Sequence, residues 1–162
     1  MKMVFDSSSI ILLAKIDMLN IATQRFECII TKEVKNECLN KDSFDSKMIS
    51  KLVKENFIKV VDMNSLKSVE YEFRLGKGEA SSLALAAHEK TAIATDDKAA
   101  IKACKILGIE FVTSIDFVLR AQEKGKITKD EARTKIMKLD EYGRYGTEII
   151  KKALEKSGDK SE

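Results

Sequence analysis

The sequence predicts an α/β fold: a three-layer α/β/α sandwich with a mostly parallel sheet of four to five strands, plus helices at the C-terminal end. Short apolar segments of strand length alternate with segments whose apolar residues recur every three or four positions, as on one face of a helix. The strand segments are apolar in their cores, which is typical of parallel strands that helices cover on both sides. The connections are short, as in a compact domain.

Length and composition indicate a globular protein. The chain has 162 residues, of which 44% are hydrophobic and 34% are charged. We expect one domain in residues 1–125 and a helical extension in residues 126–162 that packs on this domain or on a partner. The formal net charge of +3 is too small to predict nucleic-acid binding by itself.

The three cysteines, Cys28, Cys38 and Cys104, stand in apolar surroundings and form no C-x-x-C pair. We therefore expect them to be reduced core residues of a cytoplasmic protein, and we expect no zinc site. No apolar segment approaches the length of a membrane span, so we expect no membrane association.

Strand-to-helix transitions recur through the first half of the chain. Runs of apolar residues mark the strands, and spaced apolar residues such as Val34 and Cys38 mark the helices. The expected order is a strand at 1–5, helices at 10–16 and 17–22, a strand at 27–31, a helix capped by Thr31, a turn at 40–46, a helix at 48–53 and a strand at 57–61.

The second half continues this pattern and ends in helices. Residues 66–73 form one or two helical turns, and Glu79 opens a helix after two glycines. Thr128 and Glu131 form a capping box at the start of a later helix. The expected order after Glu79 is a strand at 92–95, a helix at 99–107, a strand at 110–112, a helix from Ser114 or Asp116 to Lys124, the helix after Thr128, breaks at Gly143 and Gly146, a helix at 147–156 and a frayed end.

Acidic residues follow two of the predicted strands directly. Asp6 comes after the first strand, and Asp96 and Asp97 come after the fourth. Right-handed crossovers place the carboxyl ends of parallel strands at one edge of the sheet, where open α/β sheets bind their ligands. Each of these acids could instead cap the following helix, but only one member of the adjacent pair can do so.

Two glutamates are further candidates for this edge. Glu79 lies in the first turn of its helix, where the helix dipole alone would favour a negative charge. Glu37 lies near the inner face of the helix after Thr31. Glu33 is the competing acid on that helix, although we expect it to form a capping box with Thr31. The choice between Glu37 and Glu33 is open at this point.

Carboxylates gathered in one crevice repel one another and need a compensating charge. For a cluster of oxygen ligands without His or Cys, the usual compensation is a hard divalent cation, Mg²⁺ or Mn²⁺. Such ions activate water and stabilise the leaving oxygen in phosphodiester cleavage.

Four motifs together resemble the PIN-domain family over residues 1–125. They are Asp6-Ser7-Ser8 after the first strand, Glu37 on the early helix, Gly78-Glu79-Ala80 at the start of a central helix, and Thr95-Asp96-Asp97 before a helix that ends at Leu107-Gly108. The third acid is Glu in this chain, whereas many members of the family carry Asp there.

The resemblance implies an endoribonuclease that uses Mg²⁺ or Mn²⁺ and metal-activated water to cleave single-stranded RNA. Such proteins are frequently the toxin half of a VapBC-type toxin–antitoxin pair, so RNA, an antitoxin protein and a second copy in a homodimer are the expected partners. The resemblance assigns catalytic roles to Asp6, Glu37, Glu79, Asp96 and Asp97. It assigns metal binding to Asp6, Glu79, Asp96 and Asp97.

Lys98, Lys102 and Lys105 lie at helical spacing on the helix that begins at the acidic pair. When these lysines are taken alone, a solvated helix face explains them somewhat better than RNA contact does, and a neighbouring acidic metal site makes the two explanations equally good. Ser7, Ser8 and Thr95 could hydrogen-bond the acids or an RNA phosphate, and helix capping is the simpler role for them.

Other functions remain as alternatives. A haloacid-dehalogenase phosphatase also carries an aspartate after its first strand, but it needs a second aspartate two residues later, where this chain has Ser8. A PIN-domain nuclease that processes ribosomal RNA and a non-catalytic PIN module that binds RNA or a partner are both compatible with the sequence. The presence of all the expected acids argues against the non-catalytic module.

Overall fold

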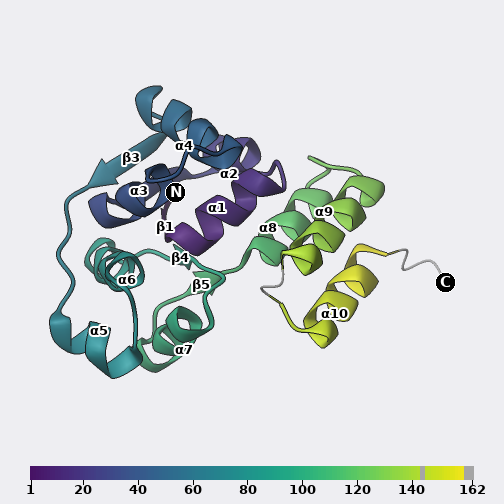
Figure 1. Ribbon diagram of the computed structural model, residues 1–162. Coiled ribbons are helices and arrows are strands. Elements are labelled where there is room, and N and C mark those ends of the chain that lie inside the picture. The colour runs from purple at the N-terminus through teal and green to yellow at the C-terminus, as the bar shows by residue number, and fades with distance from the viewer. Residues whose placement is uncertain (143–144, 159–162) are drawn as a thin grey trace. The chain divides into compact units, whose positions relative to one another are not determined.

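The computed structural model describes residues 1–142 and 145–158 (Figure 1). The chain divides into two compact units, Met1–Thr113 and Ser114–Glu162. The first unit contains the strands and the first seven helices, and the second is helical. The expected division into a domain of residues 1–125 and an extension of residues 126–162 stays a prediction.

Five parallel strands form the sheet of the first unit, in the order β3-β2-β1-β4-β5. They are β1 (Lys2–Phe5), β2 (Glu27–Thr31), β3 (Ile58–Val61), β4 (Ile93–Ala94) and β5 (Phe111–Val112). The central strand is β1, in which Val4 pairs with Ile29 of β2 on one side and with Ile93 of β4 on the other. The predicted α/β class with a parallel sheet is confirmed.

Helices lie on both faces of this sheet (Figure 1). Those on one face connect β1, β2 and β3, and are α1 (Ser7–Lys15), α2 (Leu19–Arg25), α3 (Lys32–Leu39) and α4 (Phe44–Lys54). Those on the other face connect β3, β4 and β5, and are α5 (Lys67–Phe73), α6 (Lys77–Glu89) and α7 (Lys98–Leu107). This arrangement is the expected three-layer sandwich.

Three helices begin at least two residues earlier than the sequence pattern predicted, because their first turns are mainly polar and the apolar Phe44 of α4 is exposed. Helices α1, α4 and α6 start at Ser7, Phe44 and Lys77, and their N-caps are Asp6, Ser43 and Gly76. A polar first turn carries no apolar periodicity, so the pattern identifies only the later turns.

The core between the sheet and α6 and α7 is formed by side chains from three strands and both helices. Val4, Ile29 and Ile93 from the strands pack with Leu83 of α6 and Ala103 of α7, among other buried residues. Met3, Val4 and Phe5 are all buried, so β1 is covered on both faces, as expected for a central parallel strand.

The three cysteines are free and buried, as the sequence indicated. Burial raises the pKa of the Cys28 and Cys38 thiols to about 12, and that of Cys104 to about 11. Thiols with such pKa values are protonated at neutral pH and have little nucleophilic character.

The second unit packs α8 (Ser114–Glu123), α9 (Lys129–Glu141) and α10 (Thr147–Ser157) against one another. The predicted capping box of Thr128 and Glu131 is present at the start of α9. Helix α10 includes Ser157, which the sequence placed in a frayed end, while the predicted break at Gly143 lies outside the described residues. No helix in residues 1–142 and 145–158 is long and apolar enough to cross a membrane.

Candidate functional site

Asp6 is the most deeply buried acid at the carboxyl edge of the sheet. It caps α1, and its side chain has no exposed surface. Oδ1 of the carboxylate accepts hydrogen bonds from the Ser8 hydroxyl at 2.7 Å and from the Ser9 N–H at 3.0 Å. Oδ2 accepts one from the Thr95 hydroxyl. The expected capping role is confirmed, but it engages only one of the two carboxylate oxygens.

Burial raises the pKa of Asp6 from 3.8 to about 7, against hydrogen bonds from Thr95, Ser8 and Ser9 that lower it. The negative charge of Asp96 raises this pKa further. The ionised carboxylate is therefore poorly stabilised by its surroundings at neutral pH. A cation beside it would reverse this effect, because an opposite charge favours the ionised form.

The structure distinguishes the roles of the two adjacent aspartates. Asp97 caps α7, because its Oδ2 accepts the N–H of Ala100 at 2.9 Å. Asp96 is 3% exposed, and its N–H donates to the Ser8 hydroxyl at 3.0 Å. The N–H of Asp97 donates to the Thr95 hydroxyl at 3.2 Å.

Ser8 and Thr95 each connect Asp6 to the acidic pair. The Ser8 hydroxyl donates to Asp6 Oδ1 and accepts from the N–H of Asp96, while the Thr95 hydroxyl donates to Oδ2 and accepts from the N–H of Asp97. Two hydroxyls thus hold the carboxylate of β1 beside the loop that follows β4. The backbone supports the same contact, since the N–H of Asp6 donates to the carbonyl of Ala94 at 3.1 Å.

Glu37 reaches this edge from α3. Its Oε2 accepts a hydrogen bond from the Ser7 hydroxyl, the first residue of α1, at 2.6 Å. The predicted capping box for Glu33 is wrong, because Thr31 caps α3 by accepting the N–H of Val34, which occupies the third helical position. The contact with Ser7 supports Glu37 rather than Glu33 as the second acid.

Glu79 lies in the first turn of α6 and is partly buried. Burial is the main cause that raises its pKa, and the negative charges of Glu37 and Asp97 raise it further. A hydrogen bond with the backbone of Gly76, the N-cap residue, lowers it. These influences place Glu37, Glu79 and Asp97 within electrostatic reach of one another.

The structure therefore brings the five predicted acids to the carboxyl edge of one sheet. It does not place their side chains close enough together to bind one metal ion jointly. Among the described residues, no three His, Cys, Asp or Glu side chains lie close enough together to hold a metal ion as they stand. The glutamates are on flexible side chains, whereas Asp6 is held by three hydrogen bonds.

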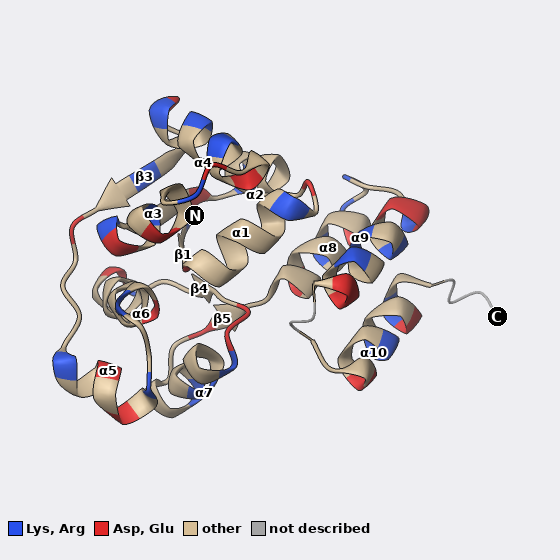
Figure 2. Cartoon of the chain, viewed as in Figure 1, with Lys and Arg blue, Asp and Glu red and all other residues tan. Residues whose placement is uncertain are grey.

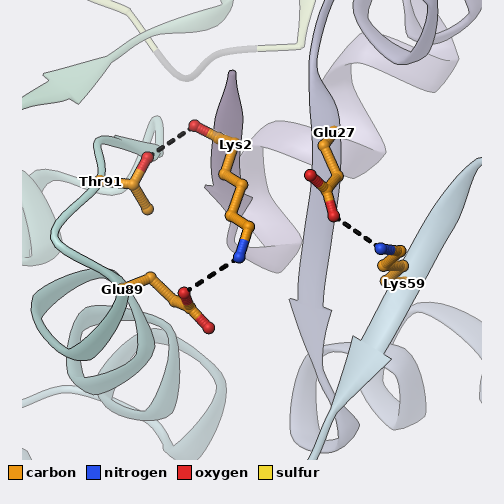
Figure 3. Close-up of polar contacts among 5 residues, drawn as sticks. All are labelled: Lys2, Glu27, Lys59, Glu89 and Thr91. Carbon is orange, nitrogen blue, oxygen red and sulfur yellow. Dashed lines mark hydrogen bonds and ion pairs between the residues drawn. The ribbon is translucent and has the colours of Figure 1, made fainter.

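Acids at the amino edge of the same sheet are paired with lysines (Figure 3). Lys2 Nζ lies 3.3 Å from Glu89 Oε2, and Lys59 Nζ lies 2.6 Å from Glu27 Oε1. By contrast, within the described part of the chain no salt bridge is formed by Asp6, Glu37, Glu79 or Asp97. These four acids therefore differ from Glu27 and Glu89, and also from Asp62, which follows β3 at the carboxyl edge and is paired with Lys32.

The chemistry of the donor set fits a hard divalent cation. The five predicted site residues all offer carboxylate oxygens, which Mg²⁺ and Mn²⁺ prefer as ligands. None of these five residues is a Cys or a His. The buried Asp6 carboxylate is a charge that would be stabilised by such an ion. Asp6, Glu79, Asp96 and Asp97 are the residues that could hold it.

The three lysines of α7 are exposed. Figure 2 shows basic residues along this helix. Lys98 and Lys102 point away from the buried residues of α7, and Lys105 Nζ lies 6.0 Å from the ring centroid of Phe111. The hydroxyls of Ser7 and Thr95 donate to Glu37 and Asp6, so both serve to position acids. Their contact with RNA stays a prediction.

The sequence indicated that Ser8 could hydrogen-bond the acids, and its contact with Asp6, two residues earlier, confirms this. The sequence indicated no separate role for Gly78. Gly78 contacts Glu37, forty-one positions earlier in the chain, and no local signal indicates this contact.

Comparison with curated proteins found no match. The family model described as DUF3368, PIN domain, matches residues 2–159, which is nearly the whole chain. The sheet order, the strand-end aspartates and this match agree with the resemblance of the sequence motifs. The chain belongs to the PIN-domain family.

Proposed function

We propose that the protein is a Mg²⁺- or Mn²⁺-dependent endoribonuclease that cleaves single-stranded RNA, and that it is the toxin component of a VapBC-type toxin–antitoxin pair. The observation that carries the nuclease proposal is the set of acids at the carboxyl edge, where Asp6 is fully buried and Asp6, Glu37, Glu79 and Asp97 form no salt bridge within the described chain. Membership of the PIN family supports the same activity.

The roles of the residues follow from their contacts. Ser8 and Thr95 orient the Asp6 carboxylate against the acidic pair, and Ser7 orients Glu37. Bound Mg²⁺ or Mn²⁺ would supply a Lewis acid that lowers the pKa of water and stabilises charge on phosphate oxygens. The exposed lysines of α7 extend from the same loop and would bind the RNA backbone.

The direct test is cleavage of a labelled single-stranded RNA with Mn²⁺, with Mg²⁺ and with EDTA. We expect metal-dependent cleavage that is lost in Asp6→Asn and in Asp96→Asn. Asparagine preserves the shape of aspartate and can still accept at a helix N-cap, so the loss would report the charge rather than misfolding. Circular dichroism of each variant checks that it is folded.

Glu27→Gln and Glu89→Gln are matched controls, because they remove carboxylates from the opposite edge of the same sheet. Both should cleave RNA at the wild-type rate. If folded, metal-loaded wild-type protein cleaves none of a varied set of RNAs but binds them, the non-catalytic module becomes the better description.

The toxin role is supported by family membership alone and needs a separate test. Induced expression of the wild-type chain should arrest growth of its host, and Asp6→Asn should not. Co-expression of the neighbouring gene should restore growth if that gene encodes an antitoxin. Ribosomal-RNA processing is the alternative, and it predicts accumulation of a precursor RNA when the gene is deleted.

A further inference from the structure

The glycine pair before Glu79 has no role in the function proposed above. Gly76 is the N-cap of α6, and Gly78 is the second residue of the helix. Gly78 has no positive φ, so its backbone conformation does not require glycine. Glycine also destabilises a helix relative to alanine. Its presence at this position therefore calls for a reason outside the helix itself.

The reason lies in the carboxylate of Glu37. A Cβ atom built on Gly78 would lie 2.1 Å from Glu37 Oε1 and 2.7 Å from both Cδ and Oε2. Every atom of the carboxylate group would thus be closer than the 3.0 Å that real Cβ atoms respect. From the other side, the Ser7 hydroxyl donates to Oε2 at 2.6 Å. The carboxylate lies between Ser7 and Gly78.

The backbone at Gly78 is fixed by buried hydrogen bonds. Its carbonyl accepts from the hydroxyls of Ser81 at 3.1 Å and Ser82 at 2.7 Å. The Ser81 hydroxyl also lies 2.9 Å from the hydroxyl of Thr31, the N-cap of α3. These contacts hold the start of α6 against the start of α3. An added methyl group at position 78 would displace the flexible end of Glu37 rather than the helix.

We infer that Gly78 is a positioning residue: its missing side chain provides the space in which Glu37 reaches the acidic edge beside Glu79. The inference deepens the proposed nuclease function and rests on it for its effect on cleavage. Gly76 has a similar but weaker effect on Glu79. A Cβ atom at Gly76 would lie 2.8 Å from Oε2 of Glu79, which is a less severe clash than the one at Gly78.

The test uses Gly78→Ala in the full chain. We expect a melting temperature equal to or above that of the wild type, since alanine is the better helix residue and only a side-chain end must move. In its crystal structure the Ser7–Glu37 contact should be lost. The single-turnover cleavage rate should fall by about 10–100-fold, the scale seen when residues that support a metal site from outside its ligands are changed.

Two further variants separate positioning from a general structural effect. Gly146→Ala makes the same substitution where no atom lies within 4 Å of the new Cβ, and it should cleave RNA at the wild-type rate even if the α10 cap is weakened. Glu37→Ala removes the group through which Gly78 is inferred to act. In that background Gly78→Ala should cause no further loss of cleavage, because the two changes affect one contact. Gly76→Ala should have a weaker effect than Gly78→Ala.

The inference is overturned if the Ser7–Glu37 contact persists in the crystal structure of Gly78→Ala, if that variant cleaves RNA normally, or if the losses from Gly78→Ala and Glu37→Ala multiply. A wild-type protein that does not cleave RNA contradicts the proposed function instead. In that case the crystal structure alone decides the inference: a displaced Glu37 carboxylate supports it, and an undisturbed one rejects it.

Discussion

At the scale of single residues, Asp6 combines two roles that the sequence presents as alternatives. It caps α1 through Oδ1, and it brings a buried negative charge to the edge of the sheet. Capping alone stabilises a protein by about 1 kcal/mol and is usually achieved by an exposed side chain. Here burial raises the pKa of the carboxyl to about 7. A purely structural cap would not need a charge in so unfavourable a position.

This raised pKa predicts how the stability of the metal-free protein depends on pH. The folded-state pKa of Asp6, about 7, lies above its ordinary value of 3.8, so the folded chain binds the proton more tightly than the unfolded chain. Asp6 therefore stabilises the folded chain fully at pH values below 3.8, and this stabilisation is lost as the pH rises through about 7. The side chain of Asp6→Asn cannot ionise, so the free energy of unfolding of this variant should lack this pH dependence.

Thermal denaturation in EDTA over about pH 5 to 8 measures the effect. The melting temperature of the wild type should fall relative to that of Asp6→Asn as pH increases, and at the upper end the variant should be the more stable protein. Glu27→Gln, at the opposite edge, should follow the wild type. Parallel profiles for the wild type and Asp6→Asn would show that Asp6 is not held in a desolvated state.

At the scale of elements, α7 begins at the acidic edge and carries the exposed lysines away from it. Asp97 caps this helix, while Asp96 precedes the cap and is buried. The same short loop therefore starts the helix, contributes to the acidic edge and leads to the basic residues (Figure 2). Two substitutions at Asp97 can separate its capping role from its charge.

Asp97→Asn should keep the cap and remove the charge, since asparagine caps helices as well as aspartate does. We expect the free energy of unfolding in urea to stay nearly unchanged and RNA cleavage to be lost. Asp97→Ala should lose cleavage and also about 1 kcal/mol of stability, because the N–H of Ala100 loses its acceptor. Full cleavage by Asp97→Asn would limit this residue to capping.

The lysines of α7 should contribute to RNA affinity through salt-dependent phosphate contacts. Replacing Lys98, Lys102 and Lys105 with glutamine should reduce the slope of log affinity against log salt by about 2, as expected for three lost contacts to a single strand. Fluorescence anisotropy with a labelled RNA at several salt concentrations measures this slope. The Asp6→Asn background prevents cleavage during the measurement.

A triple variant of lysines that form salt bridges elsewhere is the control for net charge. Replacing Lys2, Lys47 and Lys59 with glutamine removes the same number of charges from positions paired with Glu89, Asp42 and Glu27. This variant should retain most of its RNA affinity. An equal loss in both triple variants would indicate that net charge, rather than the position of the α7 lysines, determines binding.

At the scale of the whole first unit, charge is distributed unevenly between the two edges of the sheet. Lysine–carboxylate pairs form at the amino edge (Figure 3), and the acids of the PIN motifs gather at the carboxyl edge. The chain carries a formal net charge of +3, so the acidic edge does not reflect an acidic protein. It is a local concentration of negative charge that a divalent cation can neutralise.

Binding of Mg²⁺ or Mn²⁺ to the folded state alone should stabilise it. A free cation concentration of 100 times Kd raises the free energy of unfolding by about 2.7 kcal/mol. We therefore expect each cation to increase the melting temperature of the wild type relative to EDTA, and Asp6→Asn to show a much smaller increase. Glu27→Gln should respond as the wild type does. An identical increase in Asp6→Asn would place the cation elsewhere on the molecule.

The sequence by itself determined the α/β class, the strands and the acids that follow them, because apolar periodicity and strand ends are local properties of the chain. It also led to Glu37, Glu79 and the acidic pair through their motifs. It could not decide whether Asp96 or Asp97 caps α7, since both have the same side chain beside the same helix. It misassigned Glu33, because a capping box needs the glutamate three residues after the cap, and Glu33 lies only two residues after Thr31.

Only the tertiary structure decided how these residues meet. The hydroxyl of Ser8 contacts the N–H of Asp96, and that of Thr95 contacts Asp6, because β1 and β4 are neighbours although about ninety residues separate them. The space that Gly78 leaves for Glu37 arises from the packing of α6 on α3. Such contacts depend on strand order and helix packing, which local patterns leave undetermined, and they are what turns separate acids into one site.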